Sequence, residues 1–168
     1  GGTADRLQKA GISIIKVSDF TGSPEMFDGR VKTLHPKIHG GILMRRDNPK
    51  DLEDAKAHDI AEIDMVICNL YPFSEVIKNP ETSLEEALEM IDIGGPTQIR
   101  AAAKSFKDVC VICEPQDYGL VKREMHENQG GTTLKTRMKL AQKVFSTMSL
   151  YDTTVHNYIH AQFSTLYS

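Results

Sequence analysis

Residues 28–43 read Asp-Gly-Arg-Val-Lys-Thr-Leu-His-Pro-Lys-Ile-His-Gly-Gly-Ile-Leu, and the interpretation of the whole chain starts from this stretch. It gathers the fixed cations Arg30, Lys32 and Lys37 between glycines. Its residues follow neither the 3.6-residue period of a surface helix nor the alternation of a strand. Clustered Arg and Lys suit phosphate or carboxylate, and glycines let a backbone come close to a ligand. The alternative is a solvated loop beside a short helix that starts near Pro36.

The order of residues in this stretch resembles the signature of the inosine monophosphate (IMP) cyclohydrolase domain. That domain is the N-terminal half of the bifunctional aminoimidazole-carboxamide ribotide (AICAR) transformylase/IMP cyclohydrolase family of purine biosynthesis. Further motifs occur in the family's order: Gly-Gly-Thr-Ala at 1–4, Cys-Asn-Leu-Tyr-Pro-Phe at 68–73, Ile-Asp-Ile-Gly-Gly-Pro-Thr at 91–97 and Arg-Ala-Ala-Ala-Lys at 100–104. The resemblance therefore covers essentially the whole chain.

The resemblance implies an α/β, methylglyoxal-synthase-like three-layer fold with a mainly parallel sheet. The cyclohydrolase domain would occupy residues 1–133, and a helical segment at 134–168 would lead toward the transformylase domain. In the family, a strand–helix–strand unit with another phosphate-binding segment precedes the Gly-Gly-Thr turn. We therefore expect the chain to be a fragment that lacks this unit and the transformylase half.

Composition fits one globular domain, because 40% of the 168 residues are apolar and 26% are charged. The formal charge of −3 argues against a nucleic-acid binder. No apolar run approaches the roughly 20 residues of a membrane span, and no signal peptide is visible. Three cysteines cannot all pair, so a reducing cytoplasm is expected. Cys110 and Cys113 lie in an apolar run typical of a strand, which points them to opposite faces and argues against a metal site.

Periodicity and punctuation predict the order of helices and strands. The Ser83–Glu86 pair forms a capping box, Thr3 fits an N-cap, and Pro96 fits the first position of a helix. Helices are expected at 3–10, from about 36, at 49–58, 84–91, from 96, at 115–128 and at 134–163 (one long helix or two in series), and strands at 13–17, 65–69 and 109–113. An apolar stripe of Leu134, Met138, Ala141 and Phe145 is expected to bury the last helix.

Several candidate binding residues follow the predicted strands. Open α/β sheets bind ligands beyond the carboxyl ends of their strands, which favours Asn69 and Tyr71. Asp92 lies at the positive end of the next helix, where a carboxylate can also serve as a simple cap. Lys104 shares a helix face with Thr97 and Arg100 by its spacing, although a solvated stripe gives the same pattern. A lone Tyr is also commonly a half-buried aromatic with a wet hydroxyl.

The resemblance assigns roles to individual positions. Lys104 matches the proton donor/acceptor, and Lys32, Tyr71 and Asp92 match residues around the reacting groups. Nucleotide-contacting positions are matched by Gly1, Gly2, Thr3, Arg30, Val31, Thr33, Cys68, Asn69, Ile93, Gly94 and Gly95. The chain departs from the family's pattern at Ser23, where an aromatic is usual, and at Ser105, where Asn is common.

The implied reaction closes the ring of 5-formamidoimidazole-4-carboxamide ribotide to IMP with loss of water. The purine ribotide and IMP would be its only ligands, without metal or cofactor, and 10-formyltetrahydrofolate would serve only the transformylase domain. A homodimer without nucleic-acid or membrane partners is expected. Two alternatives share the fold: the nucleotide-sensing domain of carbamoyl phosphate synthetases and methylglyoxal synthase. The set of Lys32, Tyr71, Asp92 and Lys104 favours an enzyme over a sensor, because a sensor needs no proton relay.

Overall fold

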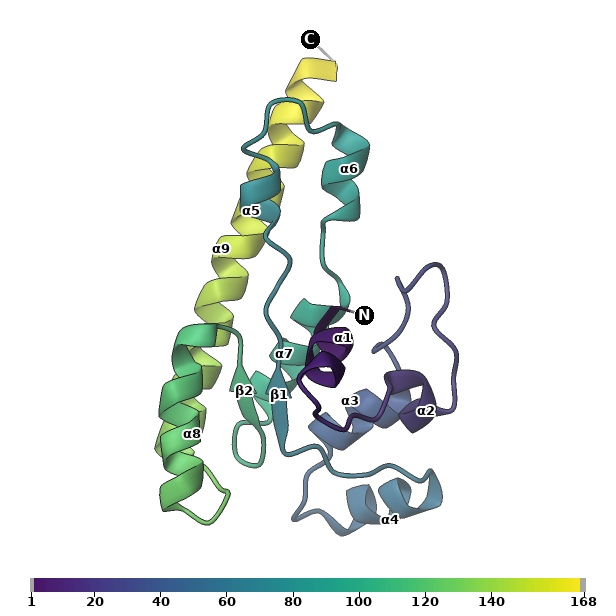
Figure 1. Ribbon diagram of the computed structural model, residues 1–168, viewed down its shortest axis with the longest axis vertical. Helices are drawn as coiled ribbons and strands as arrows, with labels where there is room; N and C mark the ends of the chain where they lie inside the picture. The colour runs from purple at the N-terminus through teal and green to yellow at the C-terminus, as the bar shows by residue number, and fades with distance from the viewer. Residues whose placement is uncertain (1, 167–168) are drawn as a thin grey trace.

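The computed structural model describes residues 2–166, and a long C-terminal helix runs the length of the molecule as a spine that contacts α5, α7 and β2 (Figure 1). The elements in order are α1 (Gly2–Lys9), α2 (Val17–Thr21), α3 (Pro36–Leu43), α4 (Pro49–Ala57), β1 (Met65–Ile67), α5 (Phe73–Val76), α6 (Leu84–Glu89), α7 (Gly94–Lys104), β2 (Cys110–Ile112), the 3₁₀ turn η1 (Pro115–Asp117), α8 (Tyr118–Glu127) and α9 (Leu134–Leu166). Within residues 2–166, none of these helices combines the length and apolarity needed to cross a membrane.

A two-stranded parallel sheet lies at the centre of the fold. β1 pairs with β2 in the register Met65–Cys110, Val66–Val111 and Ile67–Ile112. The Cys68 N–H extends this ladder by donating to the Ile112 carbonyl over 3.0 Å. Both strands therefore end at the same edge of the sheet. The predicted α/β class, its parallel sheet and the strands at 65–69 and 109–113 are confirmed, although both strands are shorter than expected.

Helix α7 connects the sheet to the helical spine. It contacts β1, β2 and α9, and its inward face buries Ile99 together with Ala101, Ala102 and Ala103. Small alanine side chains allow this helix to approach the strands closely. The face that carries Arg100 and Lys104 is exposed, as the helical spacing predicted. The first turn of α7 is thereby held close to the carboxyl end of β1.

Helix α9 is one continuous helix, but the predicted apolar stripe is wrong at three of its four positions. Its buried face consists of Leu140, Ala141, Val144 and Met148. Three of the predicted stripe residues, Leu134, Met138 and Phe145, are about half exposed. Two apolar stripes run side by side on this helix, and both satisfy helical spacing. Periodicity alone could not distinguish the stripe that meets β2 and α7 from its neighbour.

Three further expectations need correction. The predicted strand at 13–17 is absent, and α2 already begins at Val17. Ile15 is 76% exposed and Val17 packs against the core, but the run forms no strand among the described residues. Thr3 lies inside α1 and is not its N-cap. Helix α7 begins two residues before Pro96, because the Asp92 side chain accepts the Gly95 N–H and starts the helix earlier.

Local capping chemistry confirms three predicted helix starts, whereas the helix predicted at 115 begins with the 3₁₀ turn η1 and continues as α8. His35 Nδ1 accepts the Lys37 N–H over 3.1 Å at the start of α3. Ser83 and Glu86 form the predicted capping box at the start of α6. Predicted helices at 36, 49–58 and 84–91 therefore appear as α3, α4 and α6.

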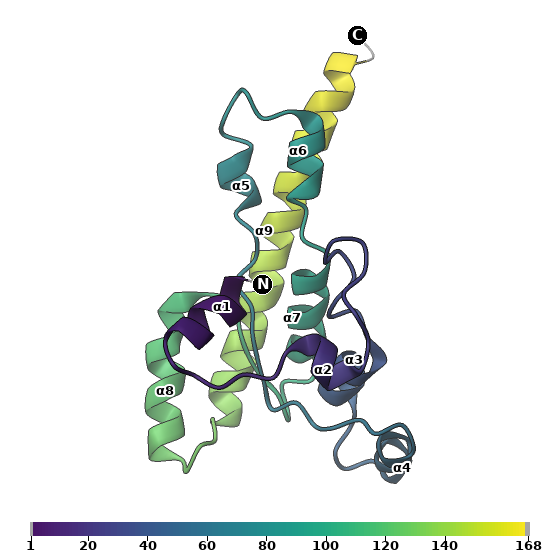
Figure 2. The same ribbon diagram turned by 45° about the vertical axis from the view of Figure 1, so that its right-hand side comes forward.

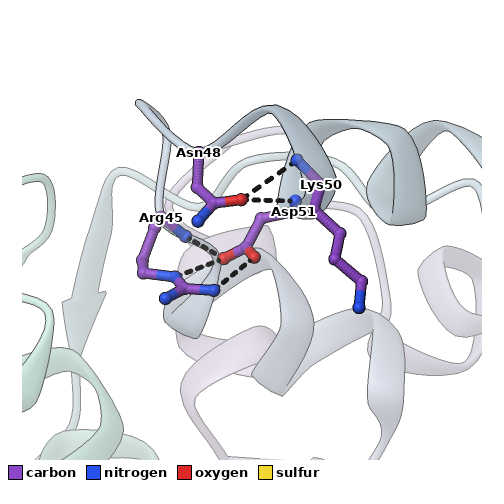
Figure 3. A network of polar contacts seen from close by, with 4 residues as sticks. All are labelled: Arg45, Asn48, Lys50 and Asp51. Carbon is purple, nitrogen blue, oxygen red and sulfur yellow. Dashed lines mark hydrogen bonds and ion pairs between the residues drawn. The ribbon is translucent and has the colours of Figure 1, made fainter.

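A polar network fixes the corner between α3 and α4 (Figure 3). The Asn48 side chain accepts the backbone N–H groups of Lys50 and Asp51 at the start of α4. The Asp51 carboxylate accepts the Arg45 backbone N–H at 2.8 Å and its guanidinium at 3.0 and 2.8 Å. These bonds to Arg45 lower the pKa of Asp51 to about 2. The corner therefore stays charged and closed throughout the physiological pH range.

The corrected core face of α9 predicts unequal costs for two identical substitutions. Leu140→Ala should lower the free energy of unfolding by about 2–5 kcal/mol, because it leaves a cavity beside β2 and α7. Leu150→Ala, on the same helix but at a side chain that is 70% exposed, should change it by about 0.5 kcal/mol or less. Urea unfolding of both variants measures the difference. Equal losses would contradict the assigned core face.

Candidate functional site

A tight turn at residues 26–31 presents the first cations of the Asp28–Leu43 stretch. Met26 and Val31 pair in an isolated antiparallel bridge, with N–H to carbonyl distances of 3.0 and 3.2 Å. Phe27, Asp28 and Gly29 all have positive φ, at 54°, 55° and 89°. Such a run of left-handed residues reverses the chain sharply. The segment that follows, 30–33, leaves this turn toward α7.

Both cations of this segment form ion pairs. Lys32 pairs with Glu25, and Arg30 pairs with Glu89 at the end of α6. The Lys32 ammonium holds the pKa of the Glu25 carboxyl below its usual value. Arg30, Glu89 and Glu25 are exposed and Lys32 is half-buried, and ion pairs with exposed partners are weak because water screens them. An incoming phosphate or carboxylate could therefore take the place of Glu25 or Glu89 beside these cations.

The glycine pair at 40–41 serves packing within the chain. A methyl group on Gly41 would lie 2.3 Å from the Ala61 carbonyl oxygen, and one on Gly40 would lie 2.9 Å from the Ile60 side chain. The Ile63 N–H also donates to the Gly41 carbonyl over 3.0 Å. These glycines let α3 approach the segment that enters β1. Close packing within the chain therefore accounts for Gly40 and Gly41 without the ligand that the sequence suggested there.

Five of the predicted site residues lie together at the first turn of α7. A methyl group on Gly94 would lie 3.1 Å from Thr33 Oγ1. One on Gly95 would lie 2.5 Å from Asp92 Oδ2 and 3.1 Å from Cys68 Sγ. Three segments far apart in sequence thus meet at two glycines: the end of the cationic turn, the end of β1 and the loop before α7.

Hydrogen bonds fix Asp92 at this junction. Its Oδ1 accepts the Gly95 N–H over 2.9 Å, and its own backbone N–H donates to the Tyr151 hydroxyl over 2.8 Å. The free N–H groups at the start of a helix attract negative charge, so this carboxylate stabilises the start of α7. Asp92 therefore acts as a cap, one of its two predicted roles, and this contact does not test the other.

Cys68 is held in its neutral form by the same junction. Its burial, followed by the Asp92 carboxylate and then Cys113, raises the pKa of the thiol to about 11. Such a thiol is a poor nucleophile at neutral pH. The adjacent Asn69 donates from Nδ2 to the Tyr118 hydroxyl over 3.3 Å. Both residues thus help define the sheet edge, and Cys68 is suited to contact a ligand without reacting with it.

The remaining predicted residues lie around this junction or away from it. Tyr71 follows β1 and is 58% exposed, and Ile93 is also exposed. Gly2 and Thr3 lie at the start of α1, which overlaps α7 in Figure 1 but is separated from it in Figure 2, so the structure does not bring these two residues to the junction. Gly1 falls outside the described residues. Val31 lies in the turn, where its N–H and carbonyl pair with Met26.

Lys104 is not brought to Asp92 within one chain. It ends α7, about 15 Å along the helix axis from Gly94 at 1.5 Å per residue. Its side chain is exposed, with no ion-pair partner in the described part of the chain. Its predicted role as proton donor remains a prediction.

Nothing in the sequence pointed to Tyr151 as part of the site, because its partner Asp92 lies far away in the chain. Its hydroxyl holds the Asp92 backbone from 59 residues further on. Tyr151 lies near the middle of α9, and its surrounding sequence carries no motif that links it to the glycines of α7. Only the packing of α9 beside α7 brings the two together.

Comparison with known proteins gives consistent matches along the chain. A family model described as the MGS-like domain matches residues 1–97, and one described as the AICARFT/IMPCHase bienzyme matches residues 102–167. The bifunctional purine biosynthesis protein PurH of Neisseria meningitidis is 51% identical over 159 residues, which are 95% of this chain and 30% of that protein. PurH of Chlorobium phaeobacteroides is 52% identical over 161 residues, which are 96% of this chain and 31% of that protein. The chain thus spans less than a third of the length of these curated relatives.

A solved structure has the same fold. The crystal structure of ForH superposes with a TM-score of 0.87 at 33% sequence identity, and the match covers 96% of this chain and 82% of that one. The arrangement of β1, α7, β2 and α9 is therefore shared with a protein of similar extent.

The protonated state of Cys68 can be tested by alkylation. At pH 8 a thiol with a pKa of about 11 should react with iodoacetamide roughly a hundredfold more slowly than one at the ordinary value of 9.0. The rates are measured by mass spectrometry in folded and urea-unfolded protein. Asp92→Asn should speed the reaction of folded Cys68 by removing a nearby negative charge, whereas Asp108→Asn should not. Equal rates in folded and unfolded protein would contradict this account of the junction.

Proposed function

Because the chain belongs to the MGS-like domain family and matches PurH proteins along nearly its whole length, we propose that it is an enzyme of purine biosynthesis, an IMP cyclohydrolase. It closes the ring of 5-formamidoimidazole-4-carboxamide ribotide to IMP with loss of water. One observation carries this proposal: Thr33, Cys68 and Asp92 meet the two glycines of α7 at the carboxyl edge of a parallel sheet. Ligands of open α/β sheets bind at this edge.

The junction suits the anionic end and the ribose of a ribotide. Helix α7 directs the positive end of its dipole at the junction, where Gly94 and Gly95 allow Thr33, Cys68 and Asp92 to approach closely. Arg30 and Lys32 supply cations whose present carboxylate partners are exposed and replaceable. Thr33 and Asn69 supply neutral hydrogen-bonding groups. In our proposal Gly1, Gly2, Thr3, Val31 and Ile93 complete the contacts with the nucleotide.

The chemistry needs proton transfer and stabilisation of a developing oxyanion. The carboxamide nitrogen attacks the formyl carbon, the formyl oxygen gains charge, and the nitrogen loses a proton. This attack closes the ring. After the oxygen has been protonated, the hydroxyl leaves as water with the proton that the former formamide nitrogen gives up, and a carbon–nitrogen double bond forms between that nitrogen and the former formyl carbon. In our proposal Lys32 and Tyr71 stabilise the oxyanion, and Asp92 orients the carboxamide through its N–H groups. This sequence of steps requires neither a metal ion nor a covalent intermediate.

Lys104 is the proposed proton donor and acceptor, on the strength of its position in the Arg-Ala-Ala-Ala-Lys motif. Its exposed ammonium has no carboxylate partner among residues 2–166, so it is free to interact with a substrate. Its distance from the first turn of α7 makes it the residue whose role most needs a direct test. We further propose that the relatives' additional length supplies AICAR formyltransferase activity, which would use 10-formyltetrahydrofolate, and that the protein forms a homodimer.

Turnover is the test of the proposed function. The protein at its full natural length is given the formamido-carboxamide ribotide, and IMP is followed by its ultraviolet absorbance against a blank without protein. Lys104→Ala should lower kcat by at least about a hundredfold, with little change in IMP affinity, since a general acid–base contributes on that scale. Lys107→Ala, at another exposed lysine just beyond α7, should leave turnover unchanged.

Each other outcome has a distinct meaning. Tight IMP binding without turnover in the parent protein would indicate a nucleotide-sensing module. Release of inorganic phosphate from dihydroxyacetone phosphate would indicate a methylglyoxal synthase. Turnover that survives Lys104→Ala at the parent rate would remove Lys104 from the mechanism and confine the chemistry to Lys32, Tyr71 and Asp92.

A further inference from the structure

Asp92 is held from two sides by groups of different elements. Its carboxylate accepts the Gly95 N–H over 2.9 Å within the first turn of α7. Its backbone N–H donates to the Tyr151 hydroxyl of α9 over 2.8 Å. The first bond fixes the side chain relative to α7, and the second fixes the backbone relative to the spine of the molecule. Together they leave the loop at 91–93 little freedom to move the carboxylate.

Packing of the Tyr151 ring keeps its hydroxyl in place to accept the Asp92 N–H. Its centroid lies 6.3 Å from that of Phe73, at an interplanar angle of 60°. Phe73 is fully buried at the start of α5, so the ring rests against a fixed surface. Burial raises the pKa of Tyr151, the Asp92 N–H opposes that shift, and the carboxylates of Asp92 and Asp152 add to it. The hydroxyl is therefore neutral at physiological pH and accepts the amide proton as a phenol.

We propose that Tyr151 is a positioning residue for the cyclisation, acting on the reacting carboxamide through the Asp92 backbone. The proposal rests on the proposed function, because it assigns a role in that reaction to a residue of α9. In the proposed role, Tyr151 does not touch the substrate itself. It holds Asp92 at the place from which the carboxylate orients the attacking nitrogen, and displacements of about 1 Å at such a point can cost about a hundredfold in rate.

Tyr158 provides a matched control on the same helix. Its ring packs edge-on against the same Phe73, with centroids 5.7 Å apart and an interplanar angle of 88°. Two turns of α9 separate it from Tyr151, and its hydroxyl makes no hydrogen bond to Asp92. Removing either hydroxyl leaves the aromatic packing in place. Only Tyr151→Phe takes away the acceptor of the Asp92 N–H.

The experiment compares Tyr151→Phe with Tyr158→Phe in the protein at its full natural length. Tyr151→Phe should lower kcat about tenfold or more with KM changed by no more than about threefold, because the misplaced carboxylate matters most in the transition state. Tyr158→Phe should stay within about twofold of the parent. Hydrogen exchange of the peptide that contains the Asp92 amide should be faster in Tyr151→Phe alone, and thermal melting of both variants checks that they are folded.

A double-mutant cycle separates positioning from general support of the fold. In an Asp92→Asn background, Tyr151→Phe should cost markedly less in kcat than it does alone, because both changes remove the same effect. Equal kcat for the two tyrosine variants, with the parent active, would overturn the proposal and leave the proposed function standing. An inactive parent would instead overturn the proposed function. Hydrogen exchange would still decide whether Tyr151 holds Asp92: unchanged exchange in Tyr151→Phe would overturn that step.

Discussion

The close approach at Gly95 is the constraint on which the site depends. A side chain at this position would occupy the space of the Asp92 carboxylate, 2.5 Å away, and press on Cys68 Sγ, 3.1 Å away. Without a side chain, the first turn of α7 can lie against the end of β1 while its N–H group binds Asp92. One residue thus lets a strand end, a helix start and a capping carboxylate share a single point. Real Cβ contacts of 2.5 Å do not persist, so any larger residue would force these segments apart.

The rest of the fold holds that point in place. The alanine face of α7 packs on β1 and β2, and the buried face of α9 packs on β2 and α7. The hydroxyl of Tyr151 accepts the Asp92 N–H and so ties the loop before α7 to α9. On the other side, the 26–31 turn brings Thr33 to Gly94 and leaves two cations beside exposed carboxylates. The packed helices and sheet therefore hold the junction in place, while Arg30 and Lys32 beside it can exchange their carboxylate partners for a ligand.

Sequence reasoning succeeded where the decisive chemistry is local. The capping box of Ser83, the Asn48-Pro49 start of α4 and the His35-Pro36 start of α3 each carry their signal within a few residues. The buried run at 109–113 needed only its apolar composition. The meeting of Thr33, Cys68 and Asp92 at the glycines of α7 agrees with motifs that the resemblance singled out.

It failed where the answer depends on a distant partner. The apolar run at 13–17 has strand composition, but it pairs with no strand among the described residues. The core face of α9 depends on which of two apolar stripes meets β2. Gly40 and Gly41 looked like ligand-binding glycines, yet Ile60 and Ala61 explain them. Tyr151 is invisible from sequence, because nothing near it indicates a bond to a loop 59 residues away.

The most direct test of this account measures IMP affinity after a methyl group is added at the junction. Gly95→Ala should weaken IMP binding, followed by isothermal titration calorimetry, by about tenfold or more, because Asp92 and Cys68 must move apart. Gly119→Ala, within α8 and with nothing within 4 Å of the added carbon, should bind IMP as the parent does. Its free energy of unfolding should be unchanged or raised by up to about 1 kcal/mol, since Ala favours helix over Gly. IMP binding by Gly95→Ala that is as tight as in the parent protein would contradict the placement of the site at this junction.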